Sequence, residues 1–460
     1  MIGSLLRPEL AELIAQRNFN QLREILISFA PPEIAEILAD LTPKDQAILL
    51  RILPQKCAAD VFEYLSVEDQ ENLLHALGNE EVAAILNELR PDDRTALLEE
   101  LPAGATQKLL NLLSPTEKKI AVQLLGYPEK SVGRLMTPDF IAVRDDWTIK
   151  EVLDHVRENG RDSETLNVVY VIDDTGKLID DVRIREFLLR PLDLKVREVR
   201  DENFVALKVT DSEETAVAVF KKYDRTALPV VDSAGRLLGI VTVDDILDVV
   251  EKENTEDIQK MGGMEALDAP YLQIGLFSMV KKRAGWLSVL FVGEMLTTSA
   301  MNHFEGELAH AIVLAAFIPL IISSGGNSGS QATSLIIRAM AIRDVSLRDW
   351  WRVLSRELLA GVLLGGVLGG LGMIRILIWH FLGWKNYGIH FLLIASTIGC
   401  SLIGVVLFGS VTGSMLPFIL RRLGFDPAVS SAPFVATLVD VTGLIIYFTI
   451  AYSILHGTLL

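Results

Sequence analysis

The chain has 460 residues, half of them hydrophobic, and a formal net charge of −17. This charge is uneven, because residues 1–268 carry a net −21 and the residues from 269 onward a net +4. A water-facing portion this acidic argues against nucleic-acid binding and attracts divalent cations. The mean hydropathy of +0.35 is high because the hydrophobic residues concentrate in the C-terminal part. The seven histidines are scattered and no nucleophile, base and orienting group cluster, so the sequence does not predict an enzyme.

Residues 1–128 contain a repeat of 24 residues. Similar segments begin at Leu41, Leu65, Leu89 and Leu113, and proline or acidic residues in each segment favour a helix start. A second short helix lies between successive segments, and neither helix can bury its apolar stripe alone. We therefore predict a small α-solenoid of stacked helix pairs. Helix electrostatics alone explain the first-turn acids, such as the pair at 92–93, although some of them also qualify as ligands for a divalent ion.

Residues 129–250 change to a tandem β-α-β-β-α pattern. Its most specific segments are the lead-in Met136-Thr-Pro, then Leu228-Pro-Val-Val-Asp and Gly239-Ile-Val-Thr-Val-Asp-Asp. The pattern resembles a pair of CBS modules, which generally bind a small ligand, often an adenine nucleotide, between the two units. Thr242 and Asp245 match the ribose-contacting Thr/Ser-x-x-Asp pattern. The first unit departs from it at residues 180–186, so at most one nucleotide site is expected.

Residues 251–280 are predicted to contain a charged linker helix that ends at Gly262-Gly263. Glu253, Glu256 and Asp257 follow an i, i+3, i+4 spacing and so share one face. Three like charges at that spacing repel one another unless something neutralises them. Two explanations stay open: a simple linker between a sensor and a membrane, or a helix that binds a dication.

Residues 281–460 are predicted to form a transmembrane domain of five helices, since about 20 apolar residues suffice to cross a bilayer. The predicted spans are 284–301, 308–338 with an interruption, 352–381, 387–420 and 428–457. Basic residues precede the first span and lie between the second and third and between the fourth and fifth. The positive-inside rule then places residues 1–283 in the cytoplasm and the C-terminus outside. The fold class is thus a multidomain α and α+β membrane protein.

Two acids and one polar run fall inside these spans. Asp440 lies near the middle of the last span, where a charge costs at least ~2.5–3.5 kcal/mol. It is explained either by a polar contact between helices or by a cation site on a permeation path. Glu294 either lines the same path or extends toward the membrane surface. The Gly-rich run Ser323–Gln331 predicts irregular backbone, which is tolerated only inside protein or beside water, and close packing through small residues is the alternative.

Four segments carry a resemblance to a known family. They are Gly325-Gly-Asn-Ser-Gly-Ser-Gln331, Leu347-Arg-Asp-Trp350, Met415-Leu-Pro-Phe-Ile-Leu-Arg-Arg-Leu-Gly424 and Asp426-Pro-Ala to Asp440-Val-Thr-Gly443. With its helical N domain, CBS pair, linking "plug" helix and five spans in this order, the chain resembles the MgtE family of bacterial magnesium channels. The resemblance implies a homodimer in the bacterial inner (plasma) membrane, with a pore along the two-fold axis lined by the second and fifth spans.

The resemblance also implies site residues. In the family, the residue matching Asp440 binds hydrated Mg²⁺ with the backbone carbonyl matching Ala436, and Glu294 and Asn327 are further pore candidates here. The sequence departs from the family at Ala432, where asparagine is common. Cytosolic Mg²⁺ closes the family's pore by binding between N domain, CBS pair and plug helix. The matching carboxylates are Asp211, Glu213, Asp224, Asp245, Glu253, Glu256 and Asp257, with Asp92 and Asp93 in the N domain. ATP binds the CBS pair of some members.

These features predict a channel that takes up Mg²⁺ down its electrochemical gradient and is shut by cytosolic Mg²⁺. Two alternatives stay open: a membrane-anchored CBS nucleotide sensor without transport activity, and a carrier that exchanges a cation for Na⁺ or H⁺. Replacing Asp440 should stop uptake by the channel and leave the sensor intact. A flux that depends on an opposing gradient would identify the carrier.

Overall fold

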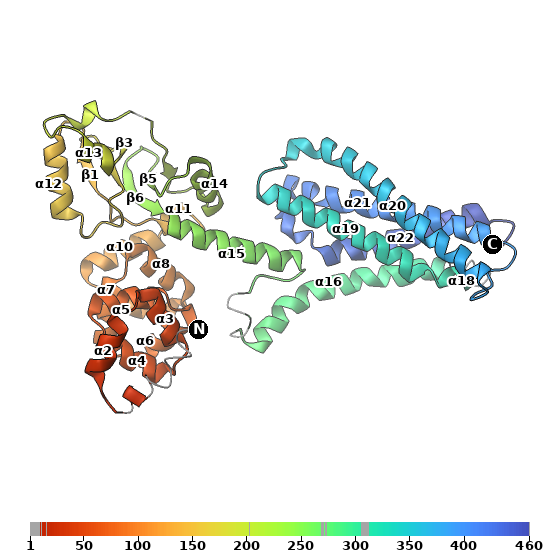
Figure 1. Ribbon diagram of the computed structural model, residues 1–460, viewed down its shortest axis with the longest axis horizontal. Helices are drawn as coiled ribbons and strands as arrows, with labels where there is room; N and C mark the ends of the chain where they lie inside the picture. Colours follow the sequence, from red (N-terminus) through yellow and green to blue (C-terminus); the bar gives the residue numbers. More distant parts are fainter. Residues whose placement is uncertain are drawn as a thin grey trace. The chain divides into compact units, whose positions relative to one another are not determined.

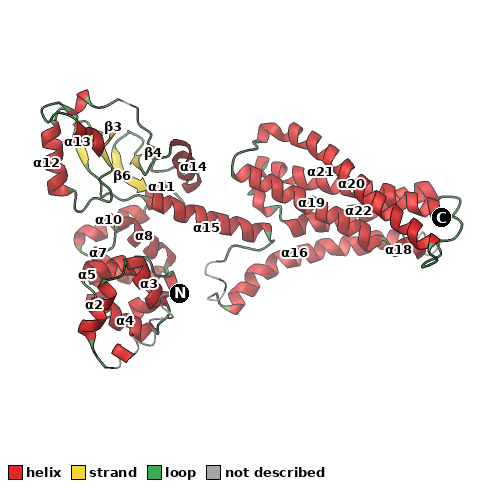
Figure 2. Ribbon diagram, viewed as in Figure 1, coloured by secondary structure: helices red, strands yellow, loops and turns green. Residues whose placement is uncertain are grey.

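The computed structural model describes residues 10, 12–14, 16–201, 203–267, 271, 274–304 and 312–459. The predicted start of the second span at residue 308 lies outside them. The chain forms two compact units, residues 1–250 and 251–460 (Figure 1). Helices dominate both units, and the strands of the described residues lie between 142 and 242 (Figure 2). The predicted α and α+β multidomain class is confirmed.

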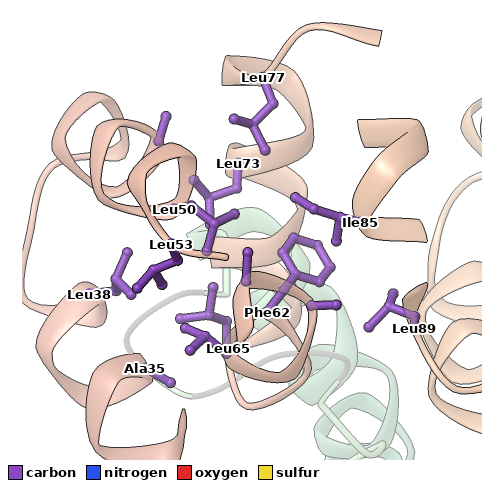
Figure 3. Packing of buried hydrophobic residues seen from close by; sticks show 14 of the residues in the cluster. Ala35, Leu38, Leu50, Leu53, Phe62, Leu65, Leu73, Leu77, Ile85 and Leu89 are labelled. Carbon is purple, nitrogen blue, oxygen red and sulfur yellow. The ribbon is translucent and has the colours of Figure 1, made fainter. Parts of the chain in front are cut away.

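The first helices repeat as pairs with the predicted 24-residue step. The first helices of successive pairs start at residues 43, 67, 91 and 115. The full set is α2 (Phe19–Ile27), α3 (Pro31–Ala39), α4 (Pro43–Ile52), α5 (Gln55–Glu63), α6 (Val67–Ala76), α7 (Asn79–Glu88), α8 (Pro91–Glu100), α9 (Ala103–Leu110) and α10 (Pro115–Leu125). Their apolar side chains form one continuous core, in which Leu50, Leu53, Phe62 and Leu65 lie close together (Figure 3). Stacking buries the stripe that no single pair could bury, so the α-solenoid forms as predicted.

A buried polar side chain recurs with the same 24-residue step. Gln46, Gln70 and Arg94 each donate a hydrogen bond of 2.8–3.0 Å to the backbone carbonyl eight residues earlier. Each accepting carbonyl lies in the last turn of the preceding helix, where carbonyls have no partner within the helix. These bonds therefore fix the register of successive helix pairs.

The CBS region contains two three-stranded sheets of the predicted pattern. After the short helix α11 (Val132–Leu135), the first unit consists of β1 (Ala142–Arg144), α12 (Ile149–Asn159), β2 (Val168–Ile172), β3 (Leu178–Arg183) and α13 (Ile184–Leu189). After η1 (Val196–Glu198), the second unit consists of β4 (Leu207–Lys208), α14 (Glu213–Tyr223), β5 (Ala227–Val231), β6 (Leu237–Thr242) and α15 (Val243–Met261). In each sheet the first two strands are parallel and the last two antiparallel. Gly176 and Gly235 take positive φ angles of 79° and 81° in the turns between the antiparallel strands.

The C-terminal unit contains five helical segments long and apolar enough to cross a membrane, as predicted. Its elements are α16 (Leu276–His303), α18 (Ile312–Ala315), α19 (Ile318–Ala341), η2 (Leu347–Asp349), α20 (Trp350–Phe381), α21 (Phe391–Arg422), η3 (Pro427–Val429) and α22 (Ala432–Leu455). The first span is longer than predicted, since it begins at Leu276. The linker helix ends at the predicted glycines but begins earlier, as α15 at Val243.

The predicted break of the second span at residues 323–331 is wrong. Helix α19 runs without interruption through this segment, and the irregular backbone lies before it, at Ala316–Phe317. The glycines serve close packing: a Cβ atom on Gly329 would lie 2.8 Å from Val435 and 3.0 Å from the carbonyl oxygen of Gly409. Small residues thus let the backbones of α19, α21 and α22 approach, which is the alternative that the sequence also allowed.

Candidate functional site

Asp440 lies in the ninth position of α22 and is half-buried. Across from it, a Cβ atom on Gly326 of α19 would lie 4.0 Å from the Asp440 Oδ1 atom and 3.6 Å from the Ala436 Cβ atom. The structure therefore brings the two predicted pore residues of α22 together with the Gly-rich run of α19. A glycine at this point leaves room beside the carboxylate that a larger side chain would fill.

Glu294 of α16 reaches the same place. Its carboxyl group lies within hydrogen-bonding reach of Asp440. The approach is possible because α16 packs on α22 at Gly293, where a Cβ atom would lie 3.0 Å from the Thr437 Cγ2 atom. Two carboxylates this close repel each other unless they share a proton or a cation. Glu294 thus lies beside Asp440 rather than extending to the membrane surface.

Asn327 lies on the exposed side of α19, where its Nδ2 atom donates to the Ser323 hydroxyl at 3.5 Å. Its neighbours Gly326 and Ser328 are buried. One side of α19 in this polar run therefore packs against other helices, and the other side is polar and exposed. Ser330 connects it to α22 by donating to the carbonyl oxygen of Ala432 at 3.2 Å.

The C-terminal end of α15 and helix α16 are both attached to the segment that leads into α22. The Lys260 Nζ atom lies 3.0 Å from the Asp426 Oδ2 atom and 3.6 Å from the Glu256 Oε2 atom. Next to it, the Trp286 indole donates to the Ser431 hydroxyl at 3.1 Å, and Ser431 caps α22. Sequence reasoning missed these attachments, since no local pattern marks a contact between residues 166 positions apart.

The three acids that their spacing places on one face of α15 are less exposed than the acid outside this face. Glu253, Glu256 and Asp257 are all half-buried, whereas Glu251 is exposed. Asn254, on the same helix, accepts a 3.3 Å hydrogen bond from Arg338 at the end of α19. Helix α15 therefore contacts the C-terminal end of α19 and the segment that precedes α22.

In the N-terminal unit, acids of the solenoid and of the CBS region form one cluster. Asp92 and Asp93 begin α8, and Asp245 lies in the first turn of α15. Repulsion between them is strong enough to affect their proton affinity. Glu63, Glu164 and Asp244 also belong to this cluster, and the Arg90 guanidinium lies 2.7 Å from Glu164.

Three carboxyl groups of this cluster have pKa values well above those of carboxyl groups in water. Burial, reinforced by the charge of Glu63, raises the pKa of Asp93 to about 8. Burial and the charge of Asp244 raise the pKa of Asp245 to about 7, although hydrogen bonds from Thr242 oppose the shift. Burial raises the pKa of Asp92 as well, and the negative charge of Asp245 is the second cause of this shift. Such a site favours whatever neutralises it, a proton or a cation.

Only part of this cluster was predicted. Asp92, Asp93 and Asp245 were named from the sequence, whereas Glu63, Glu164 and Asp244 were not. One local signal was present: the other segments of the repeat place Thr42, Ser66 and Ser114 before the helix, where each accepts a backbone N–H. The third segment has Arg90 at this position, without a capping bond. A departure from a repeat often marks a contact with another domain.

The other predicted regulatory acids lie elsewhere. Asp211 and Glu213 are at the start of α14, where the Asp211 carboxylate accepts the Lys208 N–H at 2.9 Å. Asp224 ends the same helix with a positive φ of 48°. Eleven helical residues separate the two ends by roughly 16 Å. Asp224 therefore cannot share one ion with the other two within one chain.

The described residues contain no group of three or more His, Cys, Asp or Glu side chains that converges as direct ligands of a metal ion. Mg²⁺ does not need such a group of direct ligands. It gives up its water reluctantly and is often held by one or two carboxylates through its hydration shell. Buried acids that repel one another satisfy the charge requirement of such a site.

The CBS pair also contains a basic cavity of about 430 Å³. Arg183, Arg185 and Arg225 line it, together with Asn167, Val168, Ile184, Asp224 and Thr226. The predicted nucleotide residues are at a different place: the Thr242 hydroxyl donates to Asp245 at 2.8 Å inside the acidic cluster. An acidic cluster repels phosphates, whereas arginines bind them well. The basic cavity opens at the segment where the first CBS unit departs from the nucleotide pattern.

Acids inside membrane helices, together with an acidic N-terminal unit, indicate a multidomain membrane protein whose charged sites suit divalent cations. Family profiles agree: "Divalent cation transporter" matches residues 318–450, "MgtE intracellular N domain" residues 29–130, and "CBS domain" residues 132–192 and 196–252. The chain belongs to the MgtE family of magnesium transporters.

Two relatives span nearly the whole chain. The magnesium transporter MgtE of Thermus thermophilus is 38% identical over 451 residues, which are 97% of this chain and 98% of the relative. The Enterococcus faecalis magnesium transporter MgtE is 34% identical over 446 residues, 96% of this chain and 95% of the relative. These relatives are named as transporters, in keeping with a protein that is not an enzyme.

Two solved structures match the cytosolic part. The cytosolic domain of the Mg²⁺ channel MgtE in complex with ATP is 34% identical, with a TM-score of 0.50, and the match covers 52% of this chain and 98% of that one. The soluble part of a magnesium transporter is 28% identical, with a TM-score of 0.52, and the match covers 55% of this chain and 99% of that one.

The acidic cluster predicts how stability depends on pH. A carboxyl group whose pKa is raised on folding binds more protons in the folded state, so stability falls as the pH rises between the ordinary and the raised pKa. In Mg²⁺-free buffer we expect the melting temperature of the full chain to fall between about pH 6 and about pH 8, the region of the Asp245 and Asp93 values. Added Mg²⁺ should reverse the loss.

The variant Asp93→Asn should flatten this pH dependence and raise the melting temperature at the upper end by about 3 °C or more, roughly 1 kcal/mol for a unit of this size. Glu68→Gln, at an exposed first-turn acid outside the cluster, is the matched control and should keep the wild-type profile. Equal slopes in wild type and Asp93→Asn would contradict the assignment.

Proposed function

We propose that the protein is a Mg²⁺ channel that admits the ion into the cell down its electrochemical gradient, with Asp440 as the ion-binding carboxylate of the pore. The observation that carries this proposal is the position of Asp440: inside a membrane helix, half-buried, beside Gly326 and within reach of Glu294. Acids inside membrane segments are rare and commonly mark ion pathways, which supports a cation at this place.

The proposed pore is formed by a homodimer around a two-fold axis. Within one chain, Asn327 and Ser323 present polar groups on the exposed side of α19. A second copy facing this side would enclose a polar path between two α19–α22 pairs. Two Asp440 carboxylates across the axis would supply a charge of −2, which balances one Mg²⁺.

The ion passes in its hydrated form in this proposal. Mg²⁺ dehydrates reluctantly and prefers six oxygen ligands. A carboxylate from each subunit and the Ala436 carbonyl would therefore bind it through water. A membrane potential of 100 mV contributes ~2.3 kcal/mol per charge, so roughly 4.6 kcal/mol for a dication moving inward. No ATP hydrolysis is needed to drive uptake.

The gate uses the cytosolic acids. When Mg²⁺ is scarce, the acids at Asp211, Glu213, Asp224, Asp245 and the α15 face repel one another; when it is plentiful, bound ions bridge them and the pore closes. The transported ion thus biases a two-state element. In this proposal α15 acts on α22 through the Lys260–Asp426 ion pair in the segment before α22, while Trp286 of α16 holds the start of α22 by its hydrogen bond to Ser431. Residues 1–283 face the cytoplasm in this scheme, and the C-terminus lies outside.

A nucleotide site in the CBS pair is the second part of the proposal. The related cytosolic domain was solved with ATP. The basic cavity suits an adenine nucleotide in size, since ligand cavities of about 300–1,000 Å³ are usual and this one has about 430 Å³. Its arginines suit the phosphates. We therefore place ATP at Arg183, Arg185 and Arg225 rather than at Thr242 and Asp245.

Replacing the pore carboxylate tests the channel against the sensor. Asp440→Asn should lower Mg²⁺ influx into proteoliposomes, followed with an enclosed Mg²⁺-sensitive dye, by roughly tenfold or more, because the ion loses its counter-charge in a low dielectric. Asp344→Asn, at an exposed acid between α19 and α20, is the control and should transport normally. Wild-type influx by Asp440→Asn would support the membrane-anchored sensor, and influx that requires an opposing Na⁺ or H⁺ gradient would support the carrier.

Removing the acids of α15 tests the gate. The triple variant Glu253→Ala, Glu256→Ala, Asp257→Ala should keep channels open at internal Mg²⁺ concentrations that close the wild type, because no ion is then held at this face. Patch recording with varied internal Mg²⁺ measures the open fraction. Glu251→Ala, the exposed acid on the same helix, should close normally. Unchanged closure of the triple variant would reject the mechanism.

Two arginines of one helix segment test the nucleotide site. Arg185 lines the cavity, whereas Arg190 does not, and both contact Glu186, at 3.2 Å and 3.5 Å. Arg185→Gln should weaken ATP binding by roughly tenfold, as expected for a lost charged hydrogen bond, while Arg190→Gln should bind normally. Calorimetric titration of the full chain measures both. A loss with Thr242→Val but not with Arg185→Gln would move the nucleotide to the acidic cluster.

A further inference from the structure

A buried ion pair joins the two CBS units beside the basic cavity. Asp181 lies on β3 of the first CBS unit, and Arg225 lies just before β5 of the second. The Arg225 Nη1 atom is 3.4 Å from the Asp181 Oδ2 atom. The Asp181 side chain is 1% exposed, whereas the side chain of Arg225 is 20% exposed and lines the cavity. Arg225 therefore lies between a buried carboxylate and the proposed nucleotide site.

Arg225 is the main compensation for the negative charge of Asp181. The Asp181 Oδ2 atom forms no hydrogen bond with the residues that the structure describes. Tyr170, which lies opposite Asp181 on β2, is fully buried, and its hydroxyl forms no hydrogen bond with these residues either. A buried carboxylate is costly unless an opposite charge lies nearby. Asp181 therefore depends on the same guanidinium that lines the cavity, and charge attraction holds the two together.

Asp181 is close to the point at which it binds a proton. Burial raises the pKa of Asp181 to about 6, although the charge of Arg225 opposes the shift. The charges of Asp180 and Asp201 raise this pKa as well, and the charge of Arg183 lowers it. Asp180 is itself fixed, since its carboxylate accepts the N–H groups of Asp181 and Asp201 at 2.9 Å. At neutral pH Asp181 is therefore ionised, and a partial loss of the Arg225 charge favours its protonation.

We propose that Asp181 is the counter-ion of Arg225 in the empty cavity, and that a nucleotide phosphate takes its place. This inference rests on the proposed nucleotide site. A phosphate binds arginine through two parallel charged hydrogen bonds, whereas the Asp181 Oδ2 atom has only the ion pair. The phosphate is therefore the stronger partner and draws the guanidinium toward the cavity.

The exchange leaves Asp181 buried with less compensating charge, so the carboxylate takes up a proton from the solvent. ATP binding is then linked to proton uptake, and the affinity for ATP falls as the pH rises above the Asp181 value of about 6. Asp181 touches no ligand in this scheme. It is a positioning residue that acts through Arg225.

Calorimetric titration of the full chain with ATP at several pH values tests the exchange. Asp181→Asn has no charge to be displaced. It should bind ATP within about twofold of the wild type near pH 6 and roughly tenfold more tightly near pH 8, as expected if ATP binding raises the pKa of Asp181 by about one. The phosphates of ATP titrate equally in both experiments, so the ratio of the two affinities reports Asp181 alone. Asp193→Asn, at an exposed acid after α13, is the matched control and should follow the wild type.

Proton uptake gives a second readout that a merely structural role would not change. The heat of ATP binding at neutral pH is measured in HEPES and in Tris, which have different heats of ionisation, and the difference counts the protons exchanged. The wild type should take up more protons for each ATP bound than Asp181→Asn does. If Asp181→Asn does not melt cooperatively, Asp181→Ser, a smaller neutral side chain, provides the same comparison.

Two outcomes would overturn the proposal. One is the same pH dependence of ATP affinity in the wild type and in the neutral variant. The other is weaker ATP binding by the neutral variant near pH 8, which would show that Asp181 supports the phosphate site instead of opposing it. The nucleotide site is judged separately: ATP binding that survives Arg185→Gln rejects the site, whereas a loss with Arg185→Gln and no effect at Asp181 rejects the counter-ion alone.

Discussion

The protein depends on carboxyl groups that are held close together in surroundings that do not favour charge. Asp440 and Glu294 meet between membrane helices, and Asp92, Asp93 and Asp245 meet between the solenoid and the CBS sheets. Each group is destabilising unless a proton or a cation neutralises it. A divalent ion that keeps its water is well suited to both places. The proposed pore and the proposed sensor therefore use the same chemistry, at different depths.

The helical scaffold makes this arrangement possible. Between α19, α21 and α22 the contacts are made by small residues: a Cβ atom on Gly413 would lie 2.1 Å from the carbonyl oxygen of Gly329. Such tight contacts leave no room for rearrangement within this bundle. Movement is more easily accommodated where polar contacts attach one element to another. The Lys260–Asp426 ion pair, between α15 and the segment before α22, and the Trp286–Ser431 hydrogen bond, between α16 and the start of α22, are of this kind.

Local patterns predicted much of the fold. The repeat, the strands at Val168–Ile172 and Ala227–Val231 and the five spans follow from spacing, turn residues and hydropathy. The Gly-rich run misled the prediction because glycine fits both a broken helix and a close contact, and only the neighbouring helices decide between them. Glu63 and Glu164 were missed because their partners are distant in sequence; Arg90 and Glu164, for example, are 74 residues apart. Asp440 could be chosen as a candidate from the sequence because a charge in an apolar span is unusual by itself.

Proton release on Mg²⁺ binding tests the central claim most directly. The full chain in weakly buffered solution near neutral pH is titrated with Mg²⁺ while a pH indicator dye counts the protons set free. If ions replace protons among the buried carboxyl groups, binding releases protons, and the number released falls as the pH is raised above the Asp93 value of about 8. Mg²⁺ binding that releases no protons at neutral pH would contradict the account.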